Sequence, residues 1–204
     1  MKPRSLRFCS YCGADLEDRT PDGDDRVRKV CGACDSVHYQ NPLMVVGCLV
    51  ERGDEILLCR RAIEPACGRW TTPAGYLELG EGLLAGARRE TLEEAGVDVD
   101  IVAPHAFLDL PHIGQAYALF RAVPRSPAIR AGTESLEVAF VHPGDIPWDE
   151  LAFPAVHFAL RLLLEDRGRA VAHVHSAVVA WSGAGARFDP RSYTLCDHLR
   201  RPLA

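Results

Sequence analysis

The chain has 204 residues, of which 48% are hydrophobic and 25% are charged, a composition typical of a globular protein large enough to bury a core. Its formal net charge of -5 argues against a general affinity for polyanions, because nucleic-acid-binding proteins usually present a basic patch. No apolar run approaches the length that spans a membrane, and the amino terminus lacks the apolar stretch of a signal peptide, so we expect a soluble, cytoplasmic protein.

Four of the eight cysteines form two C-x-x-C pairs near the amino terminus. Cys9 and Cys12 form the first pair and Cys31 and Cys34 the second, with 18 residues between the pairs. This spacing is typical of two zinc knuckles whose four thiolates complete a closed tetrahedral shell, although chance pairs or a redox dithiol would give the same letters. We therefore predict a zinc ribbon with one structural Zn²⁺ over residues 1–40. The other cysteines, Cys48, Cys59, Cys67 and Cys196, are expected to be reduced and mostly buried.

The segment between the two cysteine pairs argues against a nucleic-acid-binding ribbon. It reads "GADLEDRTPDGDDRVRKV" and carries six acidic and four basic residues. Such a surface is poorly suited to a phosphate backbone. A structural or dimer-forming ribbon is favoured, and a homodimer is compatible with the sequence.

The remaining elements are expected in a mixed order of strands and helices. Residues 43–51 and 55–61 are rich in β-forming residues around the turn "RGD", which indicates a hairpin, and the Gly- and Pro-rich residues 68–82 indicate a loop. A helix is predicted over about 81–95, ended by Gly96, followed by strands over 99–110, 115–123 and 135–142 and a helix over 154–167. This order predicts an α/β (α+β) sandwich over residues 41–167. Residues 168–204 form a carboxyl-terminal extension of unknown role, interpreted as a flexible or docking tail.

Three glutamates lie on one stripe of the first predicted helix. At about 100° per residue, Glu93 and Glu94 lie within roughly 60° of Glu90. Like charges four residues apart repel each other, and a divalent cation such as Mg²⁺ would relieve that repulsion. The alternative is a solvated acidic face, paired with Arg88 and Arg89.

The residues before this helix favour the metal site. From Gly75 the chain reads "GYLELGEGLLAGARRETLEEAGV", which resembles the signature of the Nudix hydrolases. The matching positions are Gly75, Glu81, Arg89, Glu90, Glu93, Glu94, Gly96 and Val97. One position departs, because Thr91 stands where an aliphatic residue is usual; Thr91 lies with Ala87 and Ala95 on the face expected to pack, where its methyl group partly serves.

The resemblance extends over residues 9 to about 175. The stretches "HYQNP", "GRWTTPAGYLELGEG", "ESLE" and "DIPWDELAFPAV" look like the zinc-ribbon Nudix group that includes ADP-ribose and FAD pyrophosphatases. This resemblance implies a Nudix α/β/α sandwich that hydrolyses a nucleoside diphosphate linked to another group. FAD or ADP-ribose would then give AMP and the other monophosphate.

The same resemblance assigns roles to individual residues. Catalytic Mg²⁺ or Mn²⁺ would be held by Glu90, Glu93 and Glu94 and by the backbone carbonyl of Gly75. Glu93 would also take part in the reaction. Glu81 lies about 180° from Glu90 on a helix, so it is expected to support Arg89 or the metal ligands rather than to join the cluster. Arg89 is a further catalytic candidate. A base or extra metal ligand is expected from a later segment, with Glu137 as the first candidate and Glu134 as the second. Trp70 and Tyr117 are aromatic candidates that would stack on the substrate or pack at the rim of its site.

Two alternatives remain open at this stage. NADH pyrophosphatases also carry a zinc ribbon, but their usual tail motif is not visible, and "LDLPHIGQAYALF" looks more like the FAD and ADP-ribose group. A nucleotide-sensing or nucleic-acid-binding regulator without catalysis is the second alternative, which the intact glutamate set disfavours. Phe153 and His157 are expected to pack. His173 and His175 would face one way on a strand, as metal ligands do, but without a third partner an exposed strand face is favoured.

Overall fold

The computed structural model describes residues 6–169 and 171–203. The chain divides into two compact units, Met1–Pro42 and Leu43–Ala204. The parts of the expected ribbon and extension at residues 1–5, 170 and 204 lie outside the described residues. Among the described residues, no helix combines the length and the apolar character needed to cross a membrane.

The first unit is a small antiparallel sheet with two cysteine turns. Its strands are β1 (Leu16–Arg19), β2 (Arg28–Cys31) and β3 (Val37–His38), in the order β1-β2-β3. In the first turn the Gly13 N–H donates to the Cys9 carbonyl over 2.9 Å, and in the second the Asp35 N–H donates to the Cys31 carbonyl over 3.0 Å. Gly13 and Asp35 both have a positive φ, of 76° and 53°, so the chain turns back sharply after each cysteine pair.

In the second unit, the described residues form one mixed sheet of nine strands. The strands are β4 (Leu43–Arg52), β5 (Glu55–Arg61), β6 (Trp70–Thr71), β7 (Ala74–Tyr76), β8 (Val99–Leu110), β9 (Gln115–Pro124), β10 (Ser135–Val141), β11 (His173–Trp181) and β12 (Tyr193–Pro202). The order is β10-β5-β4-β9-β8-β11-β12, with β6 paired to β5 and β7 paired to β4. The pairs β4/β9 and β8/β11 are parallel and the other pairs are antiparallel.

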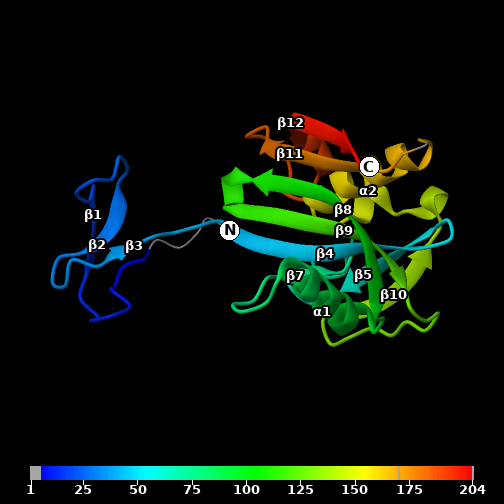
Figure 1. The fold of residues 1–204 in the computed structure, drawn as a ribbon, viewed down its shortest axis with the longest axis horizontal. Helices are drawn as coiled ribbons and strands as arrows, with labels where there is room; N and C mark the ends of the chain where they lie inside the picture. Colours follow the sequence, from blue (N-terminus) through cyan, green and yellow to red (C-terminus); the bar gives the residue numbers. More distant parts are fainter. Residues whose placement is uncertain (1–5, 170, 204) are drawn as a thin grey trace. The chain divides into compact units, whose positions relative to one another are not determined.

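Two helices cover opposite faces of this sheet, which confirms the predicted sandwich (Figure 1). Helix α1 (Leu83–Ala95) packs through Ala87 and Ala95 into one apolar core, and α2 (Pro154–Arg167) packs through Leu160 and Leu163 into the other. Four short 3₁₀ helices lie in the connections: Pro111–Ile113, Pro143–Asp145, Trp148–Glu150 and Pro190–Ser192.

The boundaries of α1 and α2 follow local signals in the sequence. Helix α1 begins two residues after the expected Glu81 and ends at Gly96, whose φ of 64° lets its N–H donate to the Leu92 carbonyl over 2.9 Å. Helix α2 begins at Pro154 and ends before Gly168, as expected. Thr91 is fully buried and its hydroxyl donates to the Ala87 carbonyl over 2.7 Å, so its polar atom is satisfied inside the helix.

Two segments differ from the sequence expectation. The segment expected as a loop contains β6 and β7, because these two- and three-residue strands depend on pairing with β5 and β4 rather than on local propensity. The segment expected as a tail forms β11 and β12, which extend the sheet beyond β8. Of the cysteines outside the ribbon, Cys48 and Cys59 are buried, whereas Cys67 and Cys196 are exposed.

Candidate functional site

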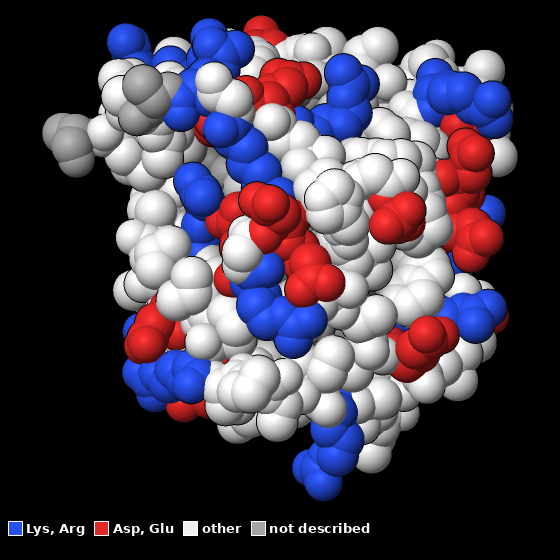
Figure 2. Space-filling model, turned by 90° about the vertical axis from the view of Figure 1, so that its right-hand side faces the viewer, with Lys and Arg blue, Asp and Glu red and all other residues white. Residues whose placement is uncertain are grey.

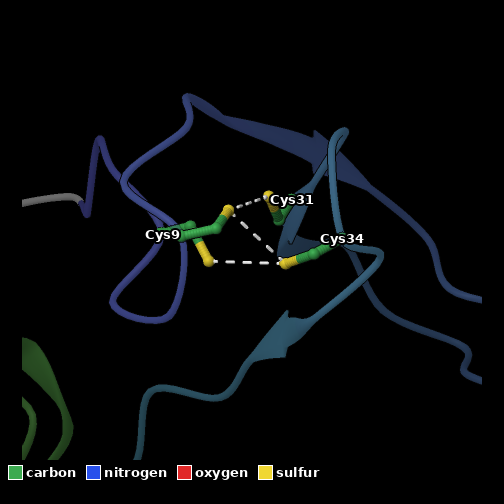
Figure 3. Close-up of side chains that lie close together, drawn as sticks. Cys9, Cys31 and Cys34 are labelled. Carbon is green, nitrogen blue, oxygen red and sulfur yellow. Dashed lines mark hydrogen bonds between the residues drawn. The ribbon is translucent and has the colours of Figure 1, made fainter.

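The four ribbon cysteines converge on one point. Their Sγ atoms lie 3.7 Å apart for Cys9 and Cys34, 3.4 Å for Cys12 and Cys31, and 3.6 Å for Cys12 and Cys34. A regular tetrahedron with Zn–S bonds of about 2.3 Å would place its sulfurs about 3.8 Å apart. Figure 3 shows the sulfurs of Cys9, Cys31 and Cys34 turned toward one another. The donor set and spacing therefore fit a structural Zn²⁺.

In the second unit, α1 delivers two buried carboxylates to a pocket. Glu90 and Glu94, one helical turn apart, are only 9% and 6% exposed, whereas Glu93 is exposed. They border a pocket of about 570 Å³, a size suited to a small-molecule ligand. The pocket is lined by Val45, Arg61, Ile63, Glu64, Pro65, Ala74, Gly75, Tyr76, Glu78, Arg89, Glu90, Glu93, Glu94, Gln115, Tyr117, Thr133, Glu134 and Phe153.

Arg89 holds three carboxylates at the mouth of this pocket. Its Nε and Nη2 donate to the two oxygens of Glu81 over 3.1 and 2.6 Å. Its Nη1 donates to Glu90 over 2.7 Å and to Glu93 over 3.0 Å, and Nη2 also donates to the Tyr76 carbonyl over 3.1 Å. The hydrogen bonds from Arg89 lower the pKa of Glu81 to about 2, so this carboxylate is ionised at pH 7. Glu81 supports Arg89, and Arg89 fixes the other two glutamates.

This arrangement predicts a moderate effect of a Glu81→Gln substitution. An amide presents only one acceptor to the guanidinium, so Arg89 would hold Glu90 and Glu93 less firmly. We expect turnover to fall by about 10- to 100-fold, the usual cost of losing a contact that supports metal ligands, which is the role expected for Glu90 and Glu93. Steady-state kinetics over a range of Mg²⁺ concentrations would measure it. A substitution that left both turnover and the Mg²⁺ requirement unchanged would contradict this role.

The two buried glutamates are closely fitted to the strand beside them. The Ala74 N–H donates to Glu94 Oε2 over 3.0 Å. A side chain on Gly75 would clash with the carboxyl group of Glu90, which explains a glycine at this position. Burial raises the pKa of Glu94 to about 7 despite the hydrogen bond from Ala74, and burial also raises the pKa of Glu90.

The chemistry of this donor set fits a hard divalent cation. Paired buried carboxylates destabilise each other when both are ionised, and a cation between them would remove that cost. Oxygen ligands of this kind suit Mg²⁺ or Mn²⁺. Glu90 and Glu94, beside Gly75, are therefore the residues of this pocket that could hold such a cation.

Of the two glutamates expected to act as a base or extra metal ligand, the structure places only Glu134 at the pocket. Glu134 lines the pocket, and its charge contributes to raising the pKa values of Glu90 and Glu94. Glu137 is exposed on β10, where its carboxylate lies 3.8 Å from Arg60, and it is not among the lining residues. A β-bulge between Ser135 and Glu137 shifts the register at this point, which the sequence pattern does not reveal.

Of the two predicted aromatic candidates, only Tyr117 lines the pocket. Tyr117 is buried and lines the pocket, and its hydroxyl donates to Gln115 Oε1 over 3.3 Å. Trp70 is half-buried on β6, packs against the core and does not line the pocket.

Sequence reasoning missed several residues of the pocket wall. The half-exposed ring of Tyr76 lines it, with its hydroxyl accepting from Gln115 Nε2 over 2.8 Å. Phe153, expected only to pack, also lines the pocket, with the Arg61 guanidinium 5.0 Å from its ring centre. Tyr76 directly follows the recognised Gly75, but Phe153 comes from a segment far along the chain that no local pattern connects to α1.

The comparisons with known proteins agree with this geometry. The family model described as NUDIX domain matches residues 41–162, and the model described as Nudix N-terminal matches residues 7–40. The chain belongs to the Nudix family. A NUDIX hydrolase from Nitrosomonas europaea has a crystal structure 43% identical in sequence, with a TM-score of 0.82, covering 85% of this chain and 99% of that one.

Other relatives of this Nudix chain are more distant or match only in part. An ADP-ribose pyrophosphatase from Streptococcus suis, 21% identical with a TM-score of 0.55 over 66% of this chain and 98% of that one, shares the fold. The NAD-capped RNA hydrolase NudC of Stutzerimonas stutzeri (strain A1501) is 42% identical over 95 residues, which are 46% of this chain and 32% of that protein. The counterpart from Chromobacterium violaceum is 39% identical over 97 residues, 47% of this chain and 34% of that protein. The matched segments span about a third of the length of these curated relatives.

Proposed function

We propose that this Nudix protein hydrolyses the diphosphate bond of ADP linked to another group, as in NADH, FAD or ADP-ribose, releasing AMP and the other monophosphate. The observation that carries the proposal is the pair of buried carboxylates, Glu90 and Glu94, beside Arg89 in a pocket of about 570 Å³. Buried carboxylates without a cation would be costly, and a diphosphate substrate needs positive charge. Membership of a family of hydrolases supports catalysis over mere sensing.

A divalent cation would be held by the carbonyl of Gly75 and the carboxylates of Glu90, Glu93 and Glu94. When bound, Mg²⁺ or Mn²⁺ supplies neutralisation of the diphosphate charge and lowers the pKa of water. The protein's own residues position these groups: Arg89 orients Glu90 and Glu93, and the Ala74 N–H orients Glu94.

Glu134 is our proposed acceptor of the proton from the attacking water, with Glu93 as the second candidate. Glu134 is exposed on the pocket wall. Among the described side chains, none donates a hydrogen bond to its carboxylate, so this carboxylate is available to accept a proton. Replacing Glu134 by Gln should lower turnover by about 100-fold or more, the usual contribution of a general base. Glu137→Gln is the matched control, because it removes a glutamate three residues away that does not line the pocket, and its turnover should stay close to that of the wild type. Equal losses in the two variants would contradict this assignment.

The identity of the second half of the substrate is the finer part of the proposal. FAD and ADP-ribose follow from the sequence resemblance, whereas the names of the curated relatives favour a nicotinamide dinucleotide. The rings of Tyr76 and Phe153 on the pocket wall are suited to stack on a planar ring of either kind. We therefore rank NADH first, and FAD and ADP-ribose next.

A panel of substrates tests the proposal. Purified protein with Mg²⁺ would be incubated separately with NADH, FAD, ADP-ribose and ATP, and products would be identified by chromatography. We expect AMP from at least one of NADH, FAD and ADP-ribose at a kcat/KM well above that for ATP. Tight binding of all four without any product would support a sensor instead.

An NAD-capped RNA is a separate arm of the same test. On the face drawn in Figure 2, acidic and basic side chains are interspersed rather than gathered into a basic stripe. The net charge of -5 also disfavours a polyanion, and we expect NADH to be cleaved at least as efficiently as a capped RNA. A strong preference for the capped RNA would move the substrate class to nucleic acid while leaving the diphosphate chemistry in place.

A further inference from the structure

A second cluster of metal-ligand side chains lies buried in the second unit, apart from the catalytic pocket. His105 on β8, Asp166 on α2 and His175 on β11 are 0%, 5% and 1% exposed. One ligand atom of each lies within 4.8 Å of those of the other two. None of the three lines the catalytic pocket. The cluster exists because β11 runs parallel to β8, with His175 opposite Ala106 in the register, and because α2 covers both strands.

Two more histidines surround this cluster. His173 Nδ1 lies 3.2 Å from Asp166 Oδ1, and its side chain is 15% exposed. His175 Nε2 lies 2.9 Å from Asp166 Oδ2, and its other nitrogen, Nδ1, lies 2.9 Å from His198 Nε2. The sequence expectation of an exposed strand face for His173 and His175 is therefore wrong, since Asp166 supplies the partner that the strand itself lacks.

Several buried atoms of the cluster have no hydrogen-bond partner among the described residues. His105 Nε2 lies 3.0 Å from the Ala159 carbonyl, which can only accept, so the ring donates there and its Nδ1 carries a lone pair. Burial lowers the pKa of His105 to about 4, which keeps the ring neutral. His105 Nδ1, Asp166 Oδ1 and His173 Nδ1 are buried and make no well-aligned hydrogen bond, although the last two lie 3.2 Å apart and Arg169 Nε lies 3.7 Å from Asp166 Oδ1. His105 Nδ1 is therefore the clearest acceptor without a partner. Unsatisfied acceptors of this kind are costly in a protein interior.

We propose that His105, Asp166 and His175 bind a divalent transition-metal cation of the Zn²⁺ class. Two imidazoles and one carboxylate are a common ligand set for zinc, and His173 lies beside Asp166 at the edge of this group. His175 would bind through Nε2 while its Nδ1 contacts His198, the arrangement in which a metal-bound histidine is oriented through its second nitrogen. A cation here would satisfy the orphaned acceptors.

The role of such a site is structural. It joins α2 to β11, and through His198 it reaches β12, so it would fasten the two carboxyl-terminal strands to the rest of the unit. Its ligands are buried, which leaves no open position for a substrate. The competing reading is a network held by hydrogen bonds alone, running from His198 through His175 to Asp166.

Zinc stoichiometry of the full-length protein separates these readings. The wild-type protein would be loaded with zinc, and excess zinc would be removed by gel filtration. The buffer would contain excess Mg²⁺, so that Mg²⁺ and not zinc occupies the carboxylate pocket. The zinc content would then be measured by elemental analysis. We expect two zinc ions per chain, one in the ribbon and one here. Asp166→Asn and His175→Gln should each retain one. His157→Gln is the matched control, because His157 also lies on α2 with a buried, unpartnered Nδ1 but outside the cluster, and it should retain two.

One zinc per chain in the wild type would overturn the proposal in favour of the hydrogen-bonded network. So would two per chain in all variants. If the Asp166 and His175 variants fail to fold, anomalous diffraction from wild-type crystals at the zinc absorption edge would show whether zinc occupies the site. A peak between His105, Asp166 and His175 is expected, and a peak at the ribbon cysteines alone would refute the site.

Discussion

A Glu94→Gln variant is expected to lose hydrolysis by more than about 100-fold while becoming more stable than the wild type in the absence of divalent cations. The loss should exceed that of a supporting residue such as Glu81, because Glu94 is a proposed direct ligand of the cation. The neutral amide keeps the size of the side chain, and its oxygen can still accept from the Ala74 N–H. The fold should therefore survive the change.

The gain in stability follows from the pKa of this carboxyl group. Burial raises the pKa of Glu94 from 4.5 to about 7, so folding disfavours its ionised form. For an acid whose pKa is higher in the folded state, stability is lost as the pH rises from about 4.5 toward 7 and remains low above that range. The cost at neutral pH is on the order of 3 kcal/mol, and the amide would avoid much of it.

Denaturant unfolding with Mg²⁺ omitted, at pH 5 and pH 8, would measure this effect beside the kinetics. The variant should exceed the wild type in stability at pH 8 and approach it at pH 5, and added Mg²⁺ should stabilise the wild type alone. Glu165→Gln, an exposed change on α2, is the control that should alter neither property. Near-normal turnover by folded Glu94→Gln protein would remove Glu94 from the proposed metal ligands.

The parts of the fold and site that the sequence could predict are those encoded by short-range periodicity. The spacing of Glu90 and Glu94 places both on one helical stripe, and in the structure both are buried at the pocket. The same spacing put Ala87 and Ala95 on the packing face, where they are fully buried. The ribbon cysteines were equally accessible to prediction, because each knuckle is a local turn.

The parts that could not be predicted depend on contacts between distant segments. Glu134 lies in the turn just before β10 and Glu137 lies within that strand, and the pairing of β10 with the distant β5 fixes where each of them lies. Only Glu134 lines the pocket. Phe153 enters the pocket wall from the residue before α2, where it resembles any core residue. The histidines of β11 appear exposed until Asp166, on another element, is brought within 2.9 Å of His175.

Removal of the ribbon zinc, by a Cys31→Ser substitution, is expected to unfold the first unit and leave the hydrolase unit folded. The described part of the first unit has little core, since its buried residues are Cys9, Val30 and Cys31. Its strands are four, four and two residues long, too short to be stable by pairing alone. The stability of such a ribbon must come from its metal, which contributes about 10–16 kcal/mol in comparable zinc peptides.

Hydrogen exchange followed by mass spectrometry would show the result segment by segment. In the variant, amides over residues 6–40 should lose their protection, the zinc content should fall by one ion per chain, and the sheet of the second unit should stay protected because it has its own two apolar cores. Cys67→Ser is the matched control, an exposed cysteine outside the ribbon that should change none of these quantities. Retained protection over residues 6–40 in a variant whose ribbon holds no zinc would mean that the small sheet is stable without its metal. Loss of protection in both units would instead mean that the second unit, despite its larger core, depends on the ribbon for its stability.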